Sequence, residues 1–184
     1  MIIIAAVKTP TLSTTTYTFN NKVKTPSVTV KNSSGTKLMK VTDTSKNGFA
    51  VKYASGRKSV GKYSVKVTLT GANYTGTKML YFKINPKGVA IWSLSRGTKA
   101  FTVKWKKPTS TYRKQMTGYQ IRYSTSSKMT SAKTVTVKST TATIKKISKL
   151  KAKKYYYVQL RTYKKIGSTY YYSGWSTVKK VKTK

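Results

Sequence analysis

"LKAKKYYYVQLRTYKK", residues 150–165, places three tyrosines in a row in a chain of 184 residues that carries 39 Lys and Arg against one acidic residue. Aromatic and β-branched residues are typical of strands, so we expect a β-strand here. Aromatic rings beside cations can form a surface that grips nucleic acid or glycan, or they can occupy the two faces of an ordinary strand. The neighbouring strands of the same sheet must decide between these two interpretations.

Alternation of apolar and polar residues with a period of two recurs along the chain, whereas helical periodicity is almost absent. In GKYSVKVTLTG, residues 61–71, four side chains are expected to face a core: Tyr63, Val65, Val67 and Leu69. Further strands are expected at residues 17–19, 28–31, 37–41, 49–53 and 78–84. Six or seven short strands of this kind predict one β-sandwich in the first half of the chain.

A second set of strands follows NPKG, residues 85–88, where a proline and a glycine interrupt the alternation. Strands are expected around residues 101–105, 119–123, 135–137 and 144, from residue 155 onward, and from residue 175 to the end. This is the size and strand count of an immunoglobulin-like or fibronectin-like sandwich. The sequence therefore predicts an all-β protein of two tandem β-sandwich domains.

The second half, residues 89–184, resembles a fibronectin type III domain of the kind found in surface proteins of Gram-positive gut bacteria. The resemblance is carried by Trp105 in TVKWKKP, by GYQIRYS, by KISKLKAKKYYYVQLRTY and by YYYSGWS. In this family a leucine stands six residues before a tyrosine whose hydroxyl caps the loop between two strands, and Leu150 and Tyr156 have that spacing. The resemblance thus implies that Trp105, Leu150 and Tyr156 belong to the structural core.

The first half more loosely resembles a bacterial Ig-like repeat, through TFNNKVKTPSVTV and VGKYSVKVTLTGANYTGTKMLYFKINP. Together the two resemblances imply a leading segment at residues 1–7, an Ig-like sandwich at residues 8–86 and a fibronectin type III-like sandwich at residues 87–184. Members of these families usually carry acidic residues where this chain has Lys, Ser or Thr. The basic charge is therefore a departure from both families.

If Tyr156 faces the core, alternation places Tyr157, Arg161 and Tyr163 on the outer face of the same strand. Trp175 in SGWS is expected to cover Arg161 by cation–π stacking, and Tyr171 lies on the adjoining hairpin. One interpretation is that this row stiffens the sheet. The other is a ligand-contact face composed of Tyr157, Arg161, Tyr163, Tyr171 and Trp175.

The amino-acid composition excludes most kinds of catalytic site. The chain has no histidine and no cysteine, and Asp43 is its one acidic residue. Catalytic triads, paired carboxylates, zinc sites and carboxylate cages for calcium or magnesium all need residues that are missing. We therefore expect a protein that is not an enzyme and that uses no cofactor or metal.

The leading functional hypothesis is a structural or adhesive module, acting as a stalk, spacer or filament segment of a bacterial cell-surface or secreted protein. The net charge of +38 favours an alternative, a cationic module that binds polyanions such as teichoic acid, anionic polysaccharide or, without sequence specificity, nucleic acid. A third is a phage or virion decoration protein. Expected partners also include other domains of a larger surface protein and further copies in a filament or lattice, and the expected location is extracellular or at the cell surface.

Overall fold

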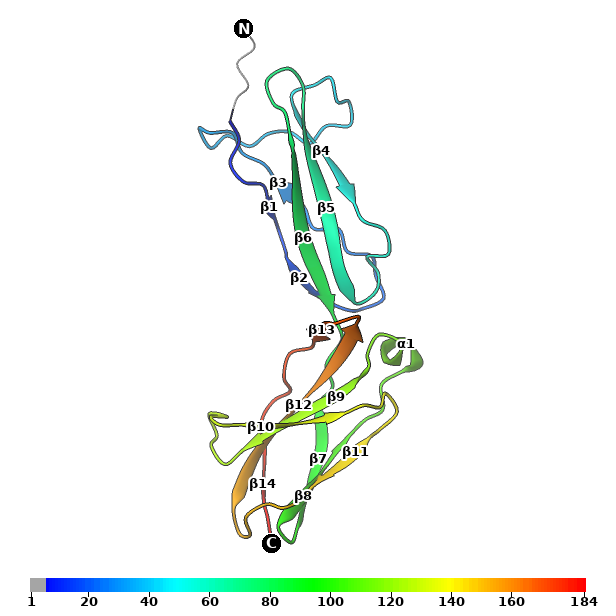
Figure 1. Ribbon diagram of the computed structural model, residues 1–184, viewed down its shortest axis with the longest axis vertical. Helices are drawn as coiled ribbons and strands as arrows, with labels where there is room; N and C mark the ends of the chain where they lie inside the picture. Colours follow the sequence, from blue (N-terminus) through cyan, green and yellow to red (C-terminus); the bar gives the residue numbers. More distant parts are fainter. Residues whose placement is uncertain (1–5) are drawn as a thin grey trace. The chain divides into compact units, whose positions relative to one another are not determined.

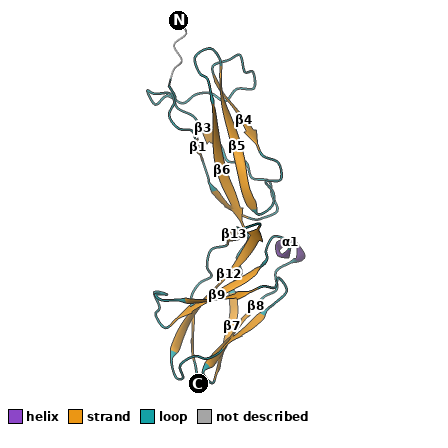
Figure 2. Cartoon of the chain, viewed as in Figure 1, coloured by secondary structure: helices purple, strands orange, loops and turns teal. Residues whose placement is uncertain are grey.

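The computed structural model describes residues 6–184, so residues 1–5 of the predicted leading segment lie outside the described residues. The chain divides into two compact units. The N-terminal unit holds the residues up to Tyr17 together with Asn21–Ile84, and the C-terminal unit holds Thr18–Asn20 together with Asn85–Lys184. Nearly all regular structure in both units is β-strand (Figure 2), which confirms the predicted fold class of an all-β chain with tandem sandwiches.

The described part of the N-terminal unit contains two sheets, and in the larger one β2 runs parallel to β6 while the other neighbours are antiparallel (Figure 1). Strands β1 (Thr11–Leu12) and β3 (Val28–Thr29) form the smaller one. The larger has four strands in the order β2 (Thr16–Thr18), β6 (Thr77–Asn85), β5 (Gly61–Thr70) and β4 (Gly48–Tyr53). Val65 and Val67 of β5 are fully buried while Lys62 and Lys66 are exposed, because alternate residues of a strand point to opposite faces.

One expected strand of this unit does not form. Residues 37–41 make only isolated bridges, from Lys37 to Lys31 and from Lys40 to Phe49. The stretch therefore follows the sheet without joining it, and the expected strand at residues 37–41 was wrong. The apolar residue at its centre, Met39, is exposed, so this stretch lacks the buried face that alternation implies for a strand.

Two sheets face each other in the C-terminal unit. The first has the order β11 (Ile144–Ile147), β8 (Ala100–Trp105) and β7 (Ile91–Gly97). The second has the order β10 (Lys133–Val137), β9 (Gly118–Ser124), β12 (Tyr155–Ile166) and β13 (Thr169–Tyr172), and β14 (Lys179–Lys182) pairs with the first part of β12. The short helix α1 (Ser110–Arg113) connects the sheets between β8 and β9.

The core of the C-terminal unit lies between these sheets. Phe101, Val103 and Trp105 of β8 meet Tyr119 and Ile121 of β9 there, all of them buried. Strand β12 adds its alternate residues Tyr156, Val158 and Leu160. Among the described residues no helix has the length or apolar character to span a bilayer.

Candidate functional site

Tyr156 is held at the start of β12 by both its ring and its hydroxyl. The side chain is only 6% exposed. Its ring packs against Phe101 with centroids 5.8 Å apart, and its Oη accepts a hydrogen bond of 3.1 Å from the backbone N–H of Lys151. Leu150 packs against the same core, and Trp105 lies deeper, with its ring centroid 4.9 Å from that of Tyr119. The bond from Lys151 ties the loop before β12 to the core.

The outer face of the second sheet brings the remaining site residues together. In the pairing of β12 with β9, Arg161 lies opposite Gln120 and Gln159 lies opposite Arg122. Paired residues of antiparallel strands share a face, so two arginines and two glutamines alternate over a small area. Arg122 had not been assigned to the site from the sequence.

Two arginines and two aromatic rings on this face form a cation–aromatic ladder, composed of Arg122, Trp175, Arg161 and Tyr172. The Arg161 guanidinium carbon lies 4.2 Å from the centroid of Trp175 and 3.8 Å from that of Tyr172. On the other side, the guanidinium carbon of Arg122 lies 4.4 Å from Trp175. Each contact is a cation over a ring face, worth roughly 0.5–1 kcal/mol where exposed and about 2 kcal/mol where water is excluded.

The glutamines bind the edges of the guanidinium groups. Arg161 donates from Nε and Nη2 to Oε1 of Gln120, at 2.9 and 2.6 Å. Arg122 donates from Nε to Oε1 of Gln159 at 2.8 Å, and Gln159 donates onward to the carbonyl of Ser176 at 2.6 Å. The ladder is thus braced across two strands and one loop by neutral acceptors, in a region where the sequence offers no carboxylates.

Two serines place Trp175 over the sheet. The Oγ of Ser173 accepts the backbone N–H of Thr162 at 3.0 Å, and the Oγ of Ser176 accepts that of Leu160 at 3.0 Å. The backbone N–H groups of the same serines donate to the carbonyls of Thr162 and Leu160, at 3.1 and 2.8 Å. The segment SGWS therefore replaces a strand along the edge of β12, because hydroxyls supply acceptors that a neighbouring backbone would otherwise provide.

Burial lowers the pKa of the Arg161 guanidinium; the neighbouring Tyr172 hydroxyl opposes this shift and the positive charge of Arg122 adds to it. Arginine nevertheless stays charged in proteins, since its ordinary pKa lies far above neutral pH. The two arginine charges are therefore held side by side by π faces and amide oxygens. Such an arrangement stores no proton and offers no nucleophile.

Two predicted members of the ligand-contact face are not open on it, one because it is covered and the other because it points the opposite way. Tyr163 shares the outer face but is only 3% exposed, since it packs on Tyr170 and Tyr172 with centroids 5.9 and 6.5 Å away. Tyr171 pairs with Lys164, whereas Tyr172 pairs with Tyr163, so Tyr171 points to the opposite face. Neither residue joins an open surface with Tyr157, which is half-buried and pairs with Lys180.

Comparison with known proteins gives a family for this sandwich. The model of the fibronectin type III domain matches residues 85–179. Among solved structures the chain is similar to the FN1–FN3 domains of chicken CNTN1, with 22% identity, coverage of 68% of this chain and 43% of that one, and a TM-score of 0.46. It is also similar to a β-1,2-glucanase from Parabacteroides distasonis, with 13% identity, coverage of 66% and 17%, and a TM-score of 0.41. The chain spans less than half the length of either, and a search of curated proteins found no match.

Proposed function

Because the chain belongs to the fibronectin type III family over residues 85–179, we propose that it is a non-enzymatic structural and adhesive module of a bacterial cell-surface or secreted protein. Fibronectin type III domains are typically structural or adhesive modules, are generally non-catalytic and occur in extracellular or surface proteins. The proposed role is that of a stalk, spacer or filament segment. An Ig-like repeat in the N-terminal unit and a Gram-positive surface are parts of the same proposal.

The cation–aromatic ladder carries this proposal. Its two guanidinium groups are bound by Gln120 and Gln159 and by the ring faces of Trp175 and Tyr172. These contacts join β9, β12, β13 and the segment after β13 on the outer face of the second sheet. A surface whose charged side chains bind neighbouring strands of the same sheet favours mechanical stiffness over the binding and release of a ligand.

The location is tested with antibodies raised against the purified chain and applied to cells of the organism that encodes it. Labelling of intact, unpermeabilised cells, lost after brief protease treatment of the cell surface, is the expected result. An antibody against a cytoplasmic protein controls for leakage. Labelling that needs permeabilised cells would contradict the proposal.

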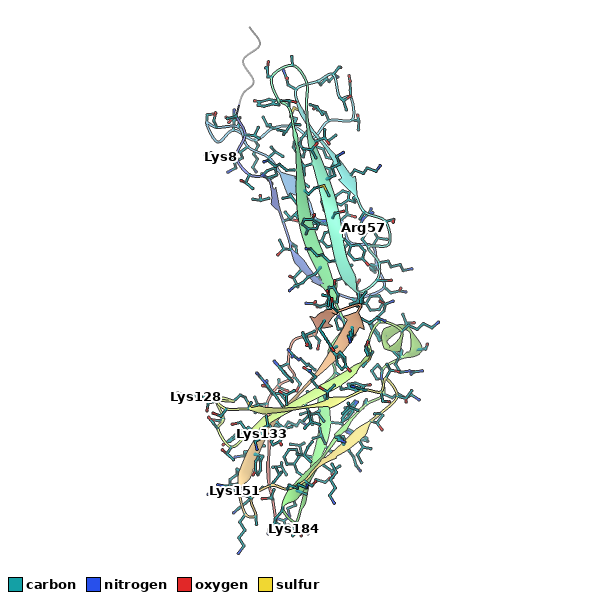
Figure 3. The ribbon with its side chains drawn as sticks, viewed as in Figure 1. Lys8, Arg57, Lys128, Lys133, Lys151 and Lys184 are labelled. Carbon is teal, nitrogen blue, oxygen red and sulfur yellow. The ribbon has the colours of Figure 1, made fainter. Side chains whose placement is uncertain are left out.

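Charge favours a second candidate function, a cationic module that binds polyanions. Basic side chains extend from both units, with Lys8 in the N-terminal unit and Lys128, Lys133, Lys151 and Lys184 in the C-terminal unit (Figure 3). Binding that rests on displaced counterions falls steeply with salt.

The test of this second candidate is a titration of the chain, and of Tyr157→Ala, with wall teichoic acid, DNA and a neutral glycan over a salt series. Binding to both polyanions that vanishes by moderate salt and ignores Tyr157 is expected from this candidate, and affinity that is independent of salt would exclude it.

A further inference from the structure

A groove of about 500 Å³ lies on the C-terminal unit, and none of the four ladder residues lines it. Its walls come from the segment before β7, the start of β7, the segment after β8 and α1. The floor is largely apolar, with Val89, Ile91 and Pro108, and four lysines stand around it: Lys87, Lys106, Lys107 and Lys179. This size lies within the range of pockets that bind small ligands.

Trp92 lines the groove with an exposed aromatic ring. Ile91 pairs with Trp105 and Ser93 pairs with Lys104, so Trp92 is the extra residue of a β-bulge in β7. The indole is 63% exposed, although large aromatic side chains normally bury most of their area. Bulges recur at binding sites because they redirect a side chain. Trp92 is therefore turned out of the sandwich and into the groove instead of being used in the core.

Two of the lysines are anchored at the groove. Lys179 donates from Nζ to the backbone carbonyl of Trp92 at 3.0 Å, next to the indole. The Nζ of Lys87 lies 3.5 Å from the hydroxyl of Tyr112 and 4.7 Å from the centroid of its ring. Lys106 and Lys107 follow β8 directly and are exposed. The groove thus combines one open aromatic face with ammonium groups from separate segments.

We propose that this groove binds an acidic polysaccharide, with the apolar face of one sugar ring on the Trp92 indole and the acid groups of adjacent sugars on the lysines. Charge complementarity selects an anionic occupant. A single open ring favours sugars over single-stranded nucleic acid, which binds along a series of aromatic platforms. Tyr112 does not extend the series, because Lys87 already covers its ring.

The proposal deepens the adhesive part of the proposed function, on which it rests, by naming the class of ligand. Experiments can contradict the ligand assignment and the surface role independently of each other. Surface labelling without binding of acidic sugars overturns the ligand assignment alone. Binding of acidic sugars by a chain that is labelled only in permeabilised cells overturns the surface role alone.

Calorimetric titration of the full chain with a tetramer of galacturonic acid, its neutral methyl ester and a short oligo-dT tests the proposal. Trp92→Ala is expected to weaken binding of the acidic tetramer about tenfold, because the ring contact is lost. Lys106→Gln/Lys107→Gln should weaken it several-fold, and the methyl ester should bind poorly. Two variants are matched controls and should bind as the unaltered chain does: Tyr81→Ala on β6 and Lys145→Gln/Lys146→Gln on β11.

Three results would overturn the assignment. First, if Trp92→Ala binds the tetramer as tightly as the unaltered chain does, no sugar ring stacks on the indole. The variant at Lys145 and Lys146 could lose as much affinity as that at Lys106 and Lys107, which would make binding a general effect of charge. Oligo-dT could bind more tightly than the tetramer and depend on Trp92, which would assign the groove to nucleic acid. Because Trp92 is exposed, an unchanged thermal midpoint is expected and verifies that its variant folds.

Discussion

At the scale of single residues, the Tyr156 hydroxyl makes one contact that can be removed alone. It accepts the backbone N–H of Lys151 at 3.1 Å while the ring packs in the core. Tyr156→Phe keeps the ring and should lower the free energy of unfolding by roughly 1–2 kcal/mol, because a partly buried donor loses its partner. Denaturant unfolding followed by tryptophan fluorescence measures this loss. Tyr155→Phe, at a neighbouring side chain that is 50% exposed, is the control, and equal stabilities of the two variants would contradict the assigned role.

Burial also separates the tyrosines by their pKa. It raises the pKa above 10.0 for four of the fifteen tyrosines: Tyr53, Tyr119, Tyr123 and Tyr163. A raised pKa in the folded state means that the neutral phenol is favoured there, so this contribution to stability is complete below pH 10 and is lost as pH rises through the folded value. Spectrophotometric titration of phenolate absorbance measures this. In Tyr163→Phe the absorbance that appears above pH 10 should shrink, and an unchanged titration above pH 10 would be inconsistent with a buried Tyr163.

At the scale of elements, alternation predicted the faces of β5, where apolar and polar residues change places without interruption, and those of β12 once Tyr156 was assigned to the core. It did not identify β7, because the bulge at Trp92 breaks the period. Alternation also assigned Tyr163 to the outer face without showing that β13 covers it with Tyr170 and Tyr172. The face on which a side chain lies is set by its own strand, whereas its exposed fraction depends on side chains of neighbouring strands.

The ladder joins several elements, so its strength is best measured as a coupling between them. A double-mutant cycle of Arg161→Ala and Trp175→Ala should give a coupling of roughly 0.5–2 kcal/mol, since the guanidinium is partly removed from water. All three tryptophans, Trp92, Trp105 and Trp175, lie in the C-terminal unit, so their fluorescence reports the unfolding of that unit in the full chain. Arg161→Ala with Tyr81→Ala is the control pair. A coupling near zero in the ladder cycle would show that the stacking is geometric only.

At the scale of the whole molecule, charge dominates. The 39 basic residues face one carboxylate, and Asp43 uses that carboxylate locally, accepting from the backbone N–H of Ser45 at 3.0 Å and from its hydroxyl at 2.7 Å. Folding therefore gathers many like charges with almost no compensating ion pairs. The contacts of the ladder arginines with π faces and amides offset part of the cost of this repulsion, although they leave the charges in place.

Self-repulsion of this size makes stability depend on salt in an unusual direction. Screening shortens the Debye length from about 30 Å at 0.01 M to about 3 Å at 1 M, so repulsion between lysines on separate strands fades as salt is added. Thermal midpoints of both units should therefore rise with sodium chloride, measured by circular dichroism for the whole chain and by tryptophan fluorescence for the C-terminal unit. Neutral sucrose is the control for exclusion effects that need no charge. A midpoint that stays flat or falls with salt would mean that the lysines are too well solvated to repel one another. In low salt any polyanion should raise the midpoint by the same screening, so a thermal shift identifies a specific site only where it disappears in Trp92→Ala.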